Sequence, residues 1–187
     1  VENGKSKITN LPWTVREEKI RSISKLDKLE LINDFCVLVY GIPHLSRQQF
    51  VEIQNTNKEF KKEGLYTIVG AGTGLGIARG YLTDIGLIAM PSEAGHCEFS
   101  PRSELELDLV DWIKRHLNIN RVSVERIVSG TGLGYITQWR LTKTDACNHP
   151  LREITCSSSN KNSINTNLPE IASKYAKNGD PLMKEVL

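Results

Sequence analysis

Two glutamates and a histidine that could do chemistry lie close together in the stretch PSEAGHCEFS, as Glu93, His96 and Glu98. Pro91 and Gly95 beside them predict a turn that leads into a strand. Side chains of these types can bind a metal ion, act as an acid–base pair, or hydrogen-bond to a polar ligand. The stretch by itself leaves all three open.

The spacing of histidines and cysteines argues against a metal site. No second histidine or cysteine stands at zinc-ligand spacing from His96. The four cysteines, at positions 36, 97, 147 and 156, form no C-x-x-C pair, which also argues against a disulfide framework and fits a reducing compartment. We therefore assign no metal ligands. The simpler alternative is that Glu93 and His96 hydrogen-bond within their own loop.

A glycine-rich run, GAGTGLG at residues 70–76, could hold phosphate groups. Alternating glycines expose backbone N–H groups and let a phosphate approach closely, and Thr73 adds a hydroxyl donor. The run is not a P-loop, because no Lys-Ser/Thr follows it, and Leu75 occupies the last glycine position of the dinucleotide fingerprint. β-like sequences on both sides predict a hairpin. The alternative is a glycine-rich turn without a ligand.

Two further acidic positions have both a chemical and a structural explanation. Asn33 ends the apolar run LELIN and Asp34 follows it, and a carboxylate at the end of a strand can take a proton from an alcohol. The alternative for this pair is a helix N-cap. Glu125 lies in a predicted first helical turn, where the helix dipole favours an acidic side chain without any ligand.

The elements expected to position these residues alternate between strands and helices, so the class is α/β or α+β. Residues 29–33 are predicted as a strand with a helix after Asp34, and strands are predicted on both sides of the turn at 91–96. The clearest helix lies in SPRSELELDLVDWIKRHLN, capped at Ser100-Pro101. A short helix from Ser123 is predicted to stop at Gly130. Helices are also predicted in TGLGYITQWRL and LPEIASKYAK, with a Ser/Asn-rich mobile loop at 156–167 before the second.

Composition excludes several classes of protein. The chain of 187 residues is 39% hydrophobic and 25% charged with a net charge of +2, an ordinary globular balance. No basic stripe points to nucleic acid, and the apolar runs are too short to span a membrane. The chain starts at Val1 without a signal-peptide core, so we expect the true N-terminus to be missing. A cytoplasmic location is expected, with organellar targeting left open.

Four blocks in this order make the chain resemble the bacterial-type glucokinase family of the hexokinase and actin-like ATPase superfamily. They are LINDF, GAGTGLG, PSEAGHCEFSP and VSVERIVSGTGL, and the resemblance runs from Val1 to Leu187. The family typically shows I-N-D-F, G-x-G-T-G-L-G, P-x-E-G-G-H-x-x-F-x-P and S-x-E-R-x-L-S-G-P-G-L. The resemblance implies an α/β fold of the actin-like ATPase (ribonuclease H-like) type, in a two-domain sugar kinase.

The resemblance also implies roles for the residues singled out above. Asn33, Glu93, His96 and Glu125 would bind the hydroxyls of glucose, and Asp34 would be both a sugar ligand and the catalytic base. Gly70, Gly72, Thr73 and Gly74 would hold the phosphates of ATP, which is used with Mg²⁺. The expected product is glucose 6-phosphate. The resemblance does not distinguish glucose from other hexoses or ATP from other phosphoryl donors. It allows a homodimer.

The chain departs from the family pattern in four ways. Ala94 replaces a glycine of the family's E-G-G-H, which would cost roughly 1 kcal/mol if that position needs positive φ. Thr131 replaces the proline of the family's S-G-P-G-L. The family's opening D-x-G-G-T-x-x-R loop and its closing adenosine-contacting segment have no match here. We therefore expect the middle of a longer enzyme, with residues 1–44 ending a small α/β domain and 45–187 forming most of a large one. The 187-residue chain is expected to be inactive alone.

Two other functions compete with a sugar kinase. A non-catalytic sugar-binding regulator on the same scaffold is disfavoured by Asp34, since a sensor need not keep a base. A nicotinamide-dependent oxidoreductase rests on the glycine run alone and fails on its spacing.

Overall fold

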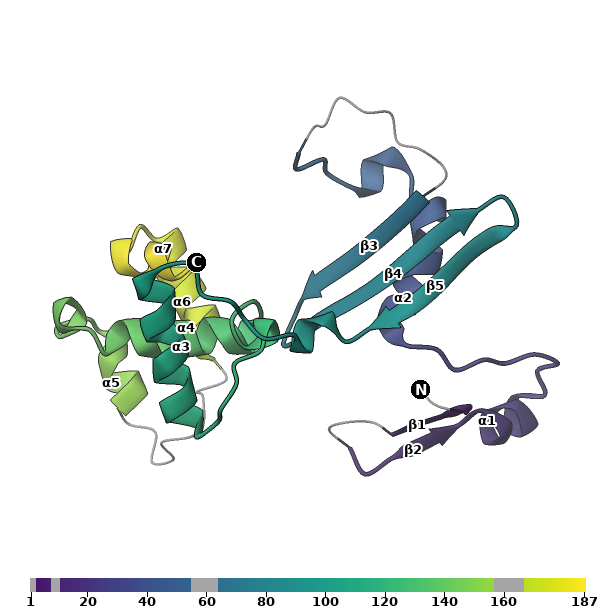
Figure 1. Ribbon diagram of the computed structural model, residues 1–187, viewed down its shortest axis with the longest axis horizontal. Helices are drawn as coiled ribbons and strands as arrows, with labels where there is room; N and C mark the ends of the chain where they lie inside the picture. Colours follow the sequence, from purple (N-terminus) through teal and green to yellow (C-terminus); the bar gives the residue numbers. More distant parts are fainter. Residues whose placement is uncertain (1–2, 8–10, 55–63, 157–166) are drawn as a thin grey trace. The chain divides into compact units, whose positions relative to one another are not determined.

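The computed structural model describes residues 3–7, 11–54, 64–156 and 167–187 (Figure 1). Most of the Ser/Asn-rich loop expected at 156–167 therefore lies outside the described residues. The chain divides into two compact units, Val1–Ile68 with Ala78–Ser92 and Val69–Ile77 with Glu93–Leu187. This division does not test the domain boundary expected after residue 44, which stays a prediction.

A three-stranded sheet with the order β3-β4-β5 is the main element of the first unit, while the ends of β3 and β4 within Val69–Ile77 belong to the second unit. The strands follow one another through links too short for a crossover, so neighbours run antiparallel. The hairpin predicted around the glycine run is confirmed as β3 and β4. The strands are β3 (Gly64–Ala71), β4 (Leu75–Thr83) and β5 (Gly86–Ser92).

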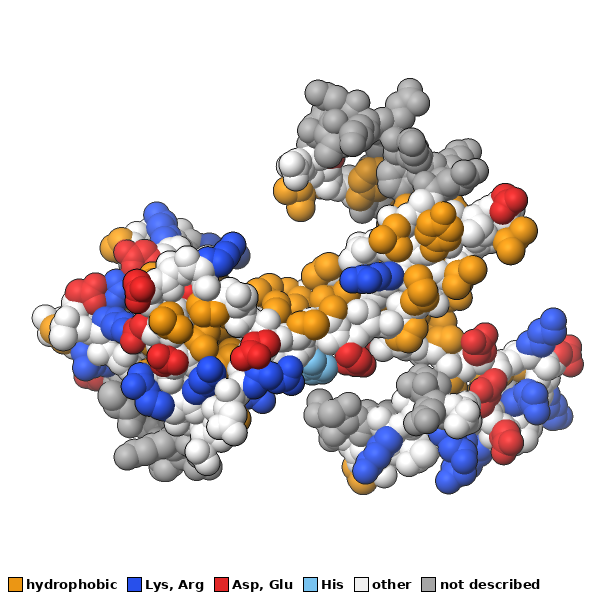
Figure 2. Space-filling model, viewed as in Figure 1, with side chains coloured by type: hydrophobic (Ala, Val, Ile, Leu, Met, Phe, Trp, Pro, Cys, Tyr) orange, Lys and Arg blue, Asp and Glu red, His pale blue; other side chains and the backbone are white. Residues whose placement is uncertain are grey.

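Helix α2 (Asp34–Gly41) packs on this sheet (Figure 1). Its buried Cys36 and Val39 form a small core with Ala78 of β4. The predicted helix start at Asp34 is confirmed. Other strand residues of the sheet keep apolar side chains in solvent, and Figure 2 shows hydrophobic side chains gathered over these strands.

The rest of the first unit consists of short strands and helices. Strands β1 and β2 form an antiparallel pair in which Ser6 faces Val15. The bounds are β1 (Lys5–Lys7), β2 (Thr14–Arg16), α1 (Glu17–Ser24) and the 3-10 helices η1 (Ile42–His44) and η2 (Arg47–Gln49).

Helices build the second unit around α4, which packs against α3, α5, α6 and α7. Trp139 of α4 is buried in a cluster with Ile113 of α3, while Leu141 joins Met183 of α7 in another. The helices are α3 (Glu104–Leu117), α4 (Gly130–Leu141), α5 (Leu151–Cys156), α6 (Leu168–Lys177) and α7 (Pro181–Val186). The 3-10 helices are η3 (Ala94–His96), η4 (Val124–Arg126) and η5 (Thr144–Ala146).

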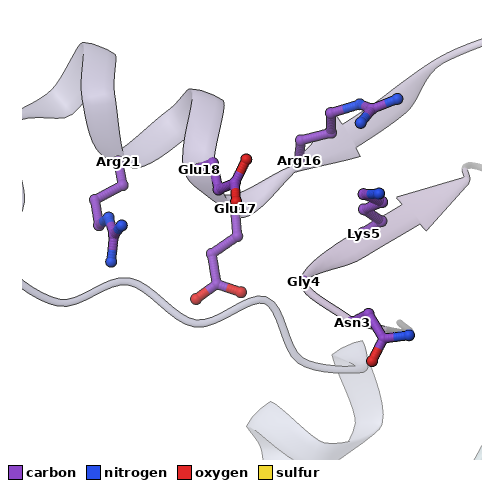
Figure 3. A pocket seen from close by; sticks show the side chains of 7 residues that line it. All are labelled: Asn3, Gly4, Lys5, Arg16, Glu17, Glu18 and Arg21. Carbon is purple, nitrogen blue, oxygen red and sulfur yellow. The ribbon is translucent and has the colours of Figure 1, made fainter.

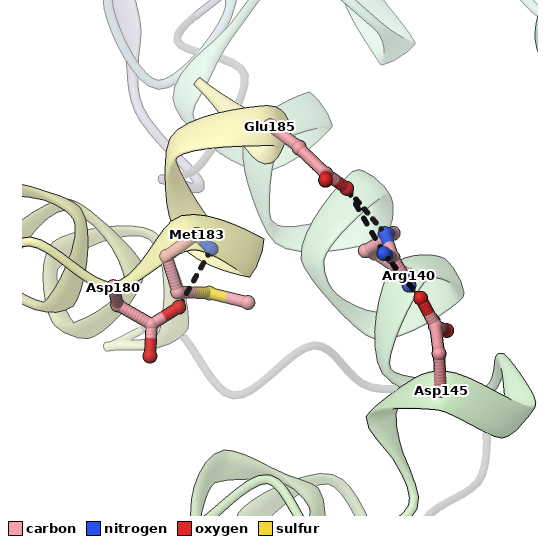
Figure 4. Close-up of polar contacts among 5 residues, drawn as sticks. All are labelled: Arg140, Asp145, Asp180, Met183 and Glu185. Atoms are coloured by element: carbon pink, nitrogen blue, oxygen red, sulfur yellow. Dashed lines mark hydrogen bonds and ion pairs between the residues drawn. The ribbon is translucent and has the colours of Figure 1, made fainter.

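Charged side chains hold the helix ends of the second unit (Figure 4). Arg140 of α4 hydrogen-bonds to both carboxylate oxygens of Asp145, at 2.8 Å each, and to Glu185 of α7 at 2.9 and 3.0 Å. The bonds to Asp145 and then to Glu185 raise the pKa of Arg140 above its ordinary value. At the start of α7, Asp180 accepts a hydrogen bond from the Met183 N–H at 2.9 Å.

Four expectations about local structure were wrong. The run at 29–33 forms no strand, and the second short strand expected in DIGLIAMPSEAGHCEF is a single bridge between Glu98 and Ser123. Helix α3 begins at Glu104 and not at Ser100-Pro101, because the hydroxyl of Ser103 accepts from the Glu106 N–H. The short helix expected from Ser123 is present as the 3-10 helix η4, but it ends at Arg126, and Gly130 begins α4 rather than ending a helix.

The helices predicted in the sequences that became α3, α4 and α6 are confirmed. In the part of the chain that the structure describes, no helix is both long and apolar enough to cross a membrane.

Candidate active site

The glycine run forms the turn between β3 and β4. Within the turn, the Gly72 N–H donates to the Gly74 carbonyl at 2.9 Å. The N–H groups of Thr73 and Gly74 donate to no group among residues 3–7, 11–54, 64–156 and 167–187. Because Gly72 and Thr73 are exposed, these N–H groups can meet an anion from solvent.

Glu125 on η4 binds the end of this turn. Its Oε2 accepts from the Leu75 N–H at 3.0 Å, and 31% of its side chain is exposed. The alternative explanation for Glu125 was interaction with its own helix dipole. In the structure, its carboxylate instead stabilises a backbone group 50 residues earlier in the chain.

His96 lies beside the second oxygen of the same carboxylate. Its Nδ1 is 3.9 Å from Glu125 Oε1, and its Nε2 is 3.4 Å from Glu93 Oε2. The side chains of His96 and Glu93 are 58% and 85% exposed. Pairs this exposed contribute little to folding stability. Their donors and acceptors are therefore free to exchange these contacts for bonds to a ligand.

Backbone pairing holds the turn at η3 next to η4. The Phe99 N–H donates to the Val122 carbonyl and the Val124 N–H to the Cys97 carbonyl, each at 2.9 Å. The guanidinium of Arg121 donates to the His96 carbonyl at 3.0 Å. Sequence reasoning missed Arg121, because its contact crosses 25 residues and no local pattern marks it.

Gly95 allows η3 to approach the glycine turn. A Cβ atom at this position would lie 2.5 Å from the Leu75 carbonyl oxygen, so only glycine fits without movement. The neighbouring Ala94 is not strained, because the described non-glycine residues with positive φ are Asn3, Lys25 and Asn118. The cost considered for alanine at position 94 therefore does not arise.

Helix α4 meets the same turn with its first residues. The Ser129 hydroxyl caps the helix by accepting from the Gly132 N–H at 2.9 Å, while the Gly130 N–H donates to the Gly72 carbonyl at 2.7 Å. Thus the three sequence blocks that carry Gly72, His96 and Glu125 surround one turn within the second unit. Gly70 lies in β3, next to the turn.

Asn33 and Asp34 belong to the first unit, where they begin α2. Asn33 Oδ1 accepts from the Phe35 and Cys36 N–H groups at 3.0 and 3.3 Å, so the N-cap alternative is correct for Asn33. Asp34 is exposed, and its Oδ1 accepts from the Phe35 N–H at 2.9 Å. Burial, and then the Asp34 charge, raise the pKa of the Cys36 thiol.

A separate cavity of about 270 Å³ lies in the first unit (Figure 3). Lys5, Arg16 and Arg21 line it together with Glu17 and Glu18, so charges of both signs face it. None of the residues predicted from the sequence to act on a ligand lines this cavity.

The glucokinase family model matches residues 1–187 of the chain. The glucokinase of Nostoc sp. is 40% identical over 141 residues, which cover 74% of this chain and 40% of that protein. The glucokinase of Zymomonas mobilis is 34% identical over 130 residues, covering 70% of this chain and 40% of that protein. The chain therefore spans about two fifths of the length of these curated relatives.

Solved glucokinase structures share the fold. The glucokinase from an Antarctic psychrotroph superimposes with a TM-score of 0.72 at 22% identity, over 100% of this chain and 52% of that chain. The glucokinase from Balamuthia mandrillaris, solved in complex with glucose, gives 0.67 at 22% identity, over 100% of this chain and 53% of that chain. The expected fold class is thereby confirmed.

Proposed function

This chain belongs to the glucokinase family, and from that premise we propose that the protein transfers the γ-phosphoryl group of ATP to the 6-hydroxyl of glucose. The observation that carries the proposal is the position of Glu125, whose carboxylate accepts a hydrogen bond from Leu75 at the glycine turn and lies 3.9 Å from His96. One carboxylate thus lies between groups suited to a phosphate and groups suited to a sugar.

We assign the sugar hydroxyls to Glu93, His96, Glu125 and Asn33. Carboxylates accept strongly from hydroxyl groups, and an imidazole or amide can both donate and accept. The exposure of Glu93 and His96 supports this role, because a ligand can reach them without disturbing the core. The Nδ2 group of Asn33 can still donate to a hydroxyl, since only its Oδ1 serves as the helix cap.

Asp34 is the proposed catalytic base. Its Oδ1 is bonded to the Phe35 N–H, and no group in the described part of the chain donates to Oδ2. This oxygen would accept the proton of the 6-hydroxyl as the hydroxyl oxygen forms its bond to the γ-phosphorus. The bond between that phosphorus and the β,γ-bridging oxygen breaks, and ADP leaves.

The glycine turn is the proposed contact for the phosphates. The available N–H groups of Thr73 and Gly74 suit phosphate oxygens. A Cβ atom at Gly72 would have no atom within 4 Å, so the space beside it is open to a ligand, and Gly70 next to the turn is assigned to the same contact. Mg²⁺ accompanying ATP would neutralise charge on the phosphates. The carbonyl oxygens of Gly72, Thr73 and Gly74 already accept hydrogen bonds within the chain, so we assign no residue of this chain to the ion.

The proposed compartment is the cytoplasm. Cys36, Cys97 and Cys147 are free thiols, which fits a reducing environment.

The direct test is a coupled assay for glucose 6-phosphate with the full-length protein, ATP, Mg²⁺ and glucose. We expect turnover that requires both ATP and glucose. Glucose binding without phosphorylation would instead identify a sugar-binding regulator.

A further inference from the structure

Thr131 contacts the glycine turn twice from the start of α4. Its hydroxyl donates to the Thr73 carbonyl at 2.8 Å, and its N–H donates to the same oxygen at 3.3 Å. The preceding N–H, of Gly130, donates to the Gly72 carbonyl. Consecutive carbonyls of the turn are thereby held against the first residues of α4.

The Thr131 hydroxyl is not needed to cap its own helix. Ser129 already occupies the N-cap position and accepts from the Gly132 N–H at 2.9 Å. Helix α4 is thus capped without the Thr131 side chain, whose hydrogen bond goes to a residue 58 positions earlier.

Holding these carbonyls also orients the N–H groups of the turn. A trans peptide group is planar, with its C=O and N–H pointing in opposite directions. Since the Gly72 and Thr73 carbonyls point at α4, the N–H groups of Thr73 and Gly74 point away from it. These are the N–H groups that donate to no described residue.

We infer that Thr131 is a positioning residue for the phosphoryl donor, holding the peptide between Thr73 and Gly74 so that the Gly74 N–H faces a phosphate oxygen. This inference rests on the proposed function. Thr131 need not touch ATP or glucose, because it acts through the Thr73 carbonyl.

The test compares Thr131→Val with Thr131→Ser in the full-length protein. Valine removes the hydroxyl at similar size, whereas serine keeps it. Thr142→Val is the matched control, because the Thr142 hydroxyl donates to the Trp139 carbonyl at the opposite end of α4. Affinities for a non-hydrolysable ATP analogue and for glucose are measured by calorimetry, and KM for ATP and for glucose by the coupled assay.

We expect Thr131→Val to weaken the affinity for the ATP analogue, and to raise KM for ATP, by about three- to tenfold, the size of one lost hydrogen bond. Glucose affinity should be unchanged, and Thr131→Ser and Thr142→Val should match the wild type. If Thr131→Val fails to fold, Thr131→Ala takes the same test.

The outcomes separate the inference from the proposed function. If the wild type binds the analogue and Thr131→Val binds it equally well, the inference alone is overturned. Equal weakening for glucose and analogue, or a Thr131→Ser variant as weak as Thr131→Val, would show a merely structural role and overturn it too. A wild type that binds glucose but no ATP analogue would overturn the proposed function, and the inference with it.

Discussion

Helices α2 and α4 both start with residues of the proposed site, but they satisfy their first N–H groups in different ways. At α2, side chains of Asn33 and Asp34 accept from the helix's own N–H groups. At α4, Ser129 caps one N–H while Gly130 and Thr131 donate to the glycine turn. The start of α2 is therefore complete by itself, whereas the start of α4 joins two distant segments of the chain.

This difference predicts different consequences of substitution. Changes at the start of α2 should alter chemistry or local helix stability without moving other segments. Changes at the start of α4 should displace the turn that is proposed to bind phosphate.

The largest effect is expected from Asp34→Asn. The amide still accepts from the Phe35 N–H but cannot take a proton, so kcat should fall by about 10²- to 10⁴-fold. Glucose affinity measured by calorimetry should be retained, because the amide still hydrogen-bonds. Asp27→Asn, in the same unit, is the control and should keep normal turnover. A near-normal kcat in Asp34→Asn would show that Asp34 is not the catalytic base.

Gly132→Ala should destabilise the start of α4. A Cβ there would lie 2.3 Å from the Ile127 carbonyl oxygen, so the backbone must move. We expect a loss of about 1–3 kcal/mol in the free energy of unfolding, measured by urea denaturation. Gly41→Ala at the end of α2 is the matched control, because nothing lies within 4 Å of its added Cβ. Equal stability of the two variants would show that the start of α4 accepts a side chain at position 132 without cost.

Asn33 can be used to separate capping from sugar binding. Asn33→Ala should cost about 1 kcal/mol of unfolding free energy through the lost cap, and should also weaken glucose binding. Asn33→Asp keeps the cap, since aspartate is an equally good N-cap, but loses the Nδ2 donor. It should therefore weaken glucose binding at unchanged stability. Normal glucose affinity in Asn33→Asp would exclude Asn33 from the sugar site.

The smallest effect is a difference in acid sensitivity between α7 and α4. Partial burial raises the pKa of Asp180, but the hydrogen bonds from the Met183 N–H and with His149 outweigh it, so the pKa lies below its ordinary value. A carboxylate with a lowered folded-state pKa stabilises the fold above its unfolded pKa of about 4, and this stabilisation is lost as pH falls through the folded-state value. The hydroxyl cap of α4 does not titrate.

Asp180→Asn tests this directly, because asparagine keeps the cap without a charge. The dependence of unfolding free energy on pH below about 4 should be shallower in Asp180→Asn than in the wild type. Identical acid denaturation profiles would show that Asp180 contributes nothing to this dependence. Ser129→Ala should lower stability equally at all pH values.

Patterns within short segments predicted much of the fold. Local hydrophobic periodicity, together with residues that interrupt helices and strands, predicted the hairpin around the glycine run and the start of α2. The same patterns predicted helices α3, α4 and α6. The strand expected at 29–33 failed because a strand needs a hydrogen-bonded neighbour, and this run pairs with none of the described residues. Apolar alternation cannot show whether that neighbour exists.

The site was less predictable because its contacts join distant segments. Gly130 was expected to end a helix, but it begins α4. A Cβ atom at Gly130 would lie 3.1 Å from the Gly72 carbonyl oxygen, so glycine allows the start of α4 to pack closely against the glycine turn. Glu125 and His96 could be named from the sequence, but the bond from Leu75 to Glu125 could not. The roles given to Asn33, Asp34, Glu93, His96 and Glu125 remain proposals.

The most direct test of the account is calorimetric titration with glucose of the full-length wild type and of Glu93→Gln, His96→Ala and Glu125→Gln. Each substitution leaves a sugar hydroxyl less well paired, so we predict weaker binding by about 1–3 kcal/mol in each variant. Glu98→Gln, from the same stretch but without an assigned role, should bind like the wild type. Unchanged glucose affinity in all three site variants would contradict the assignment of the sugar site.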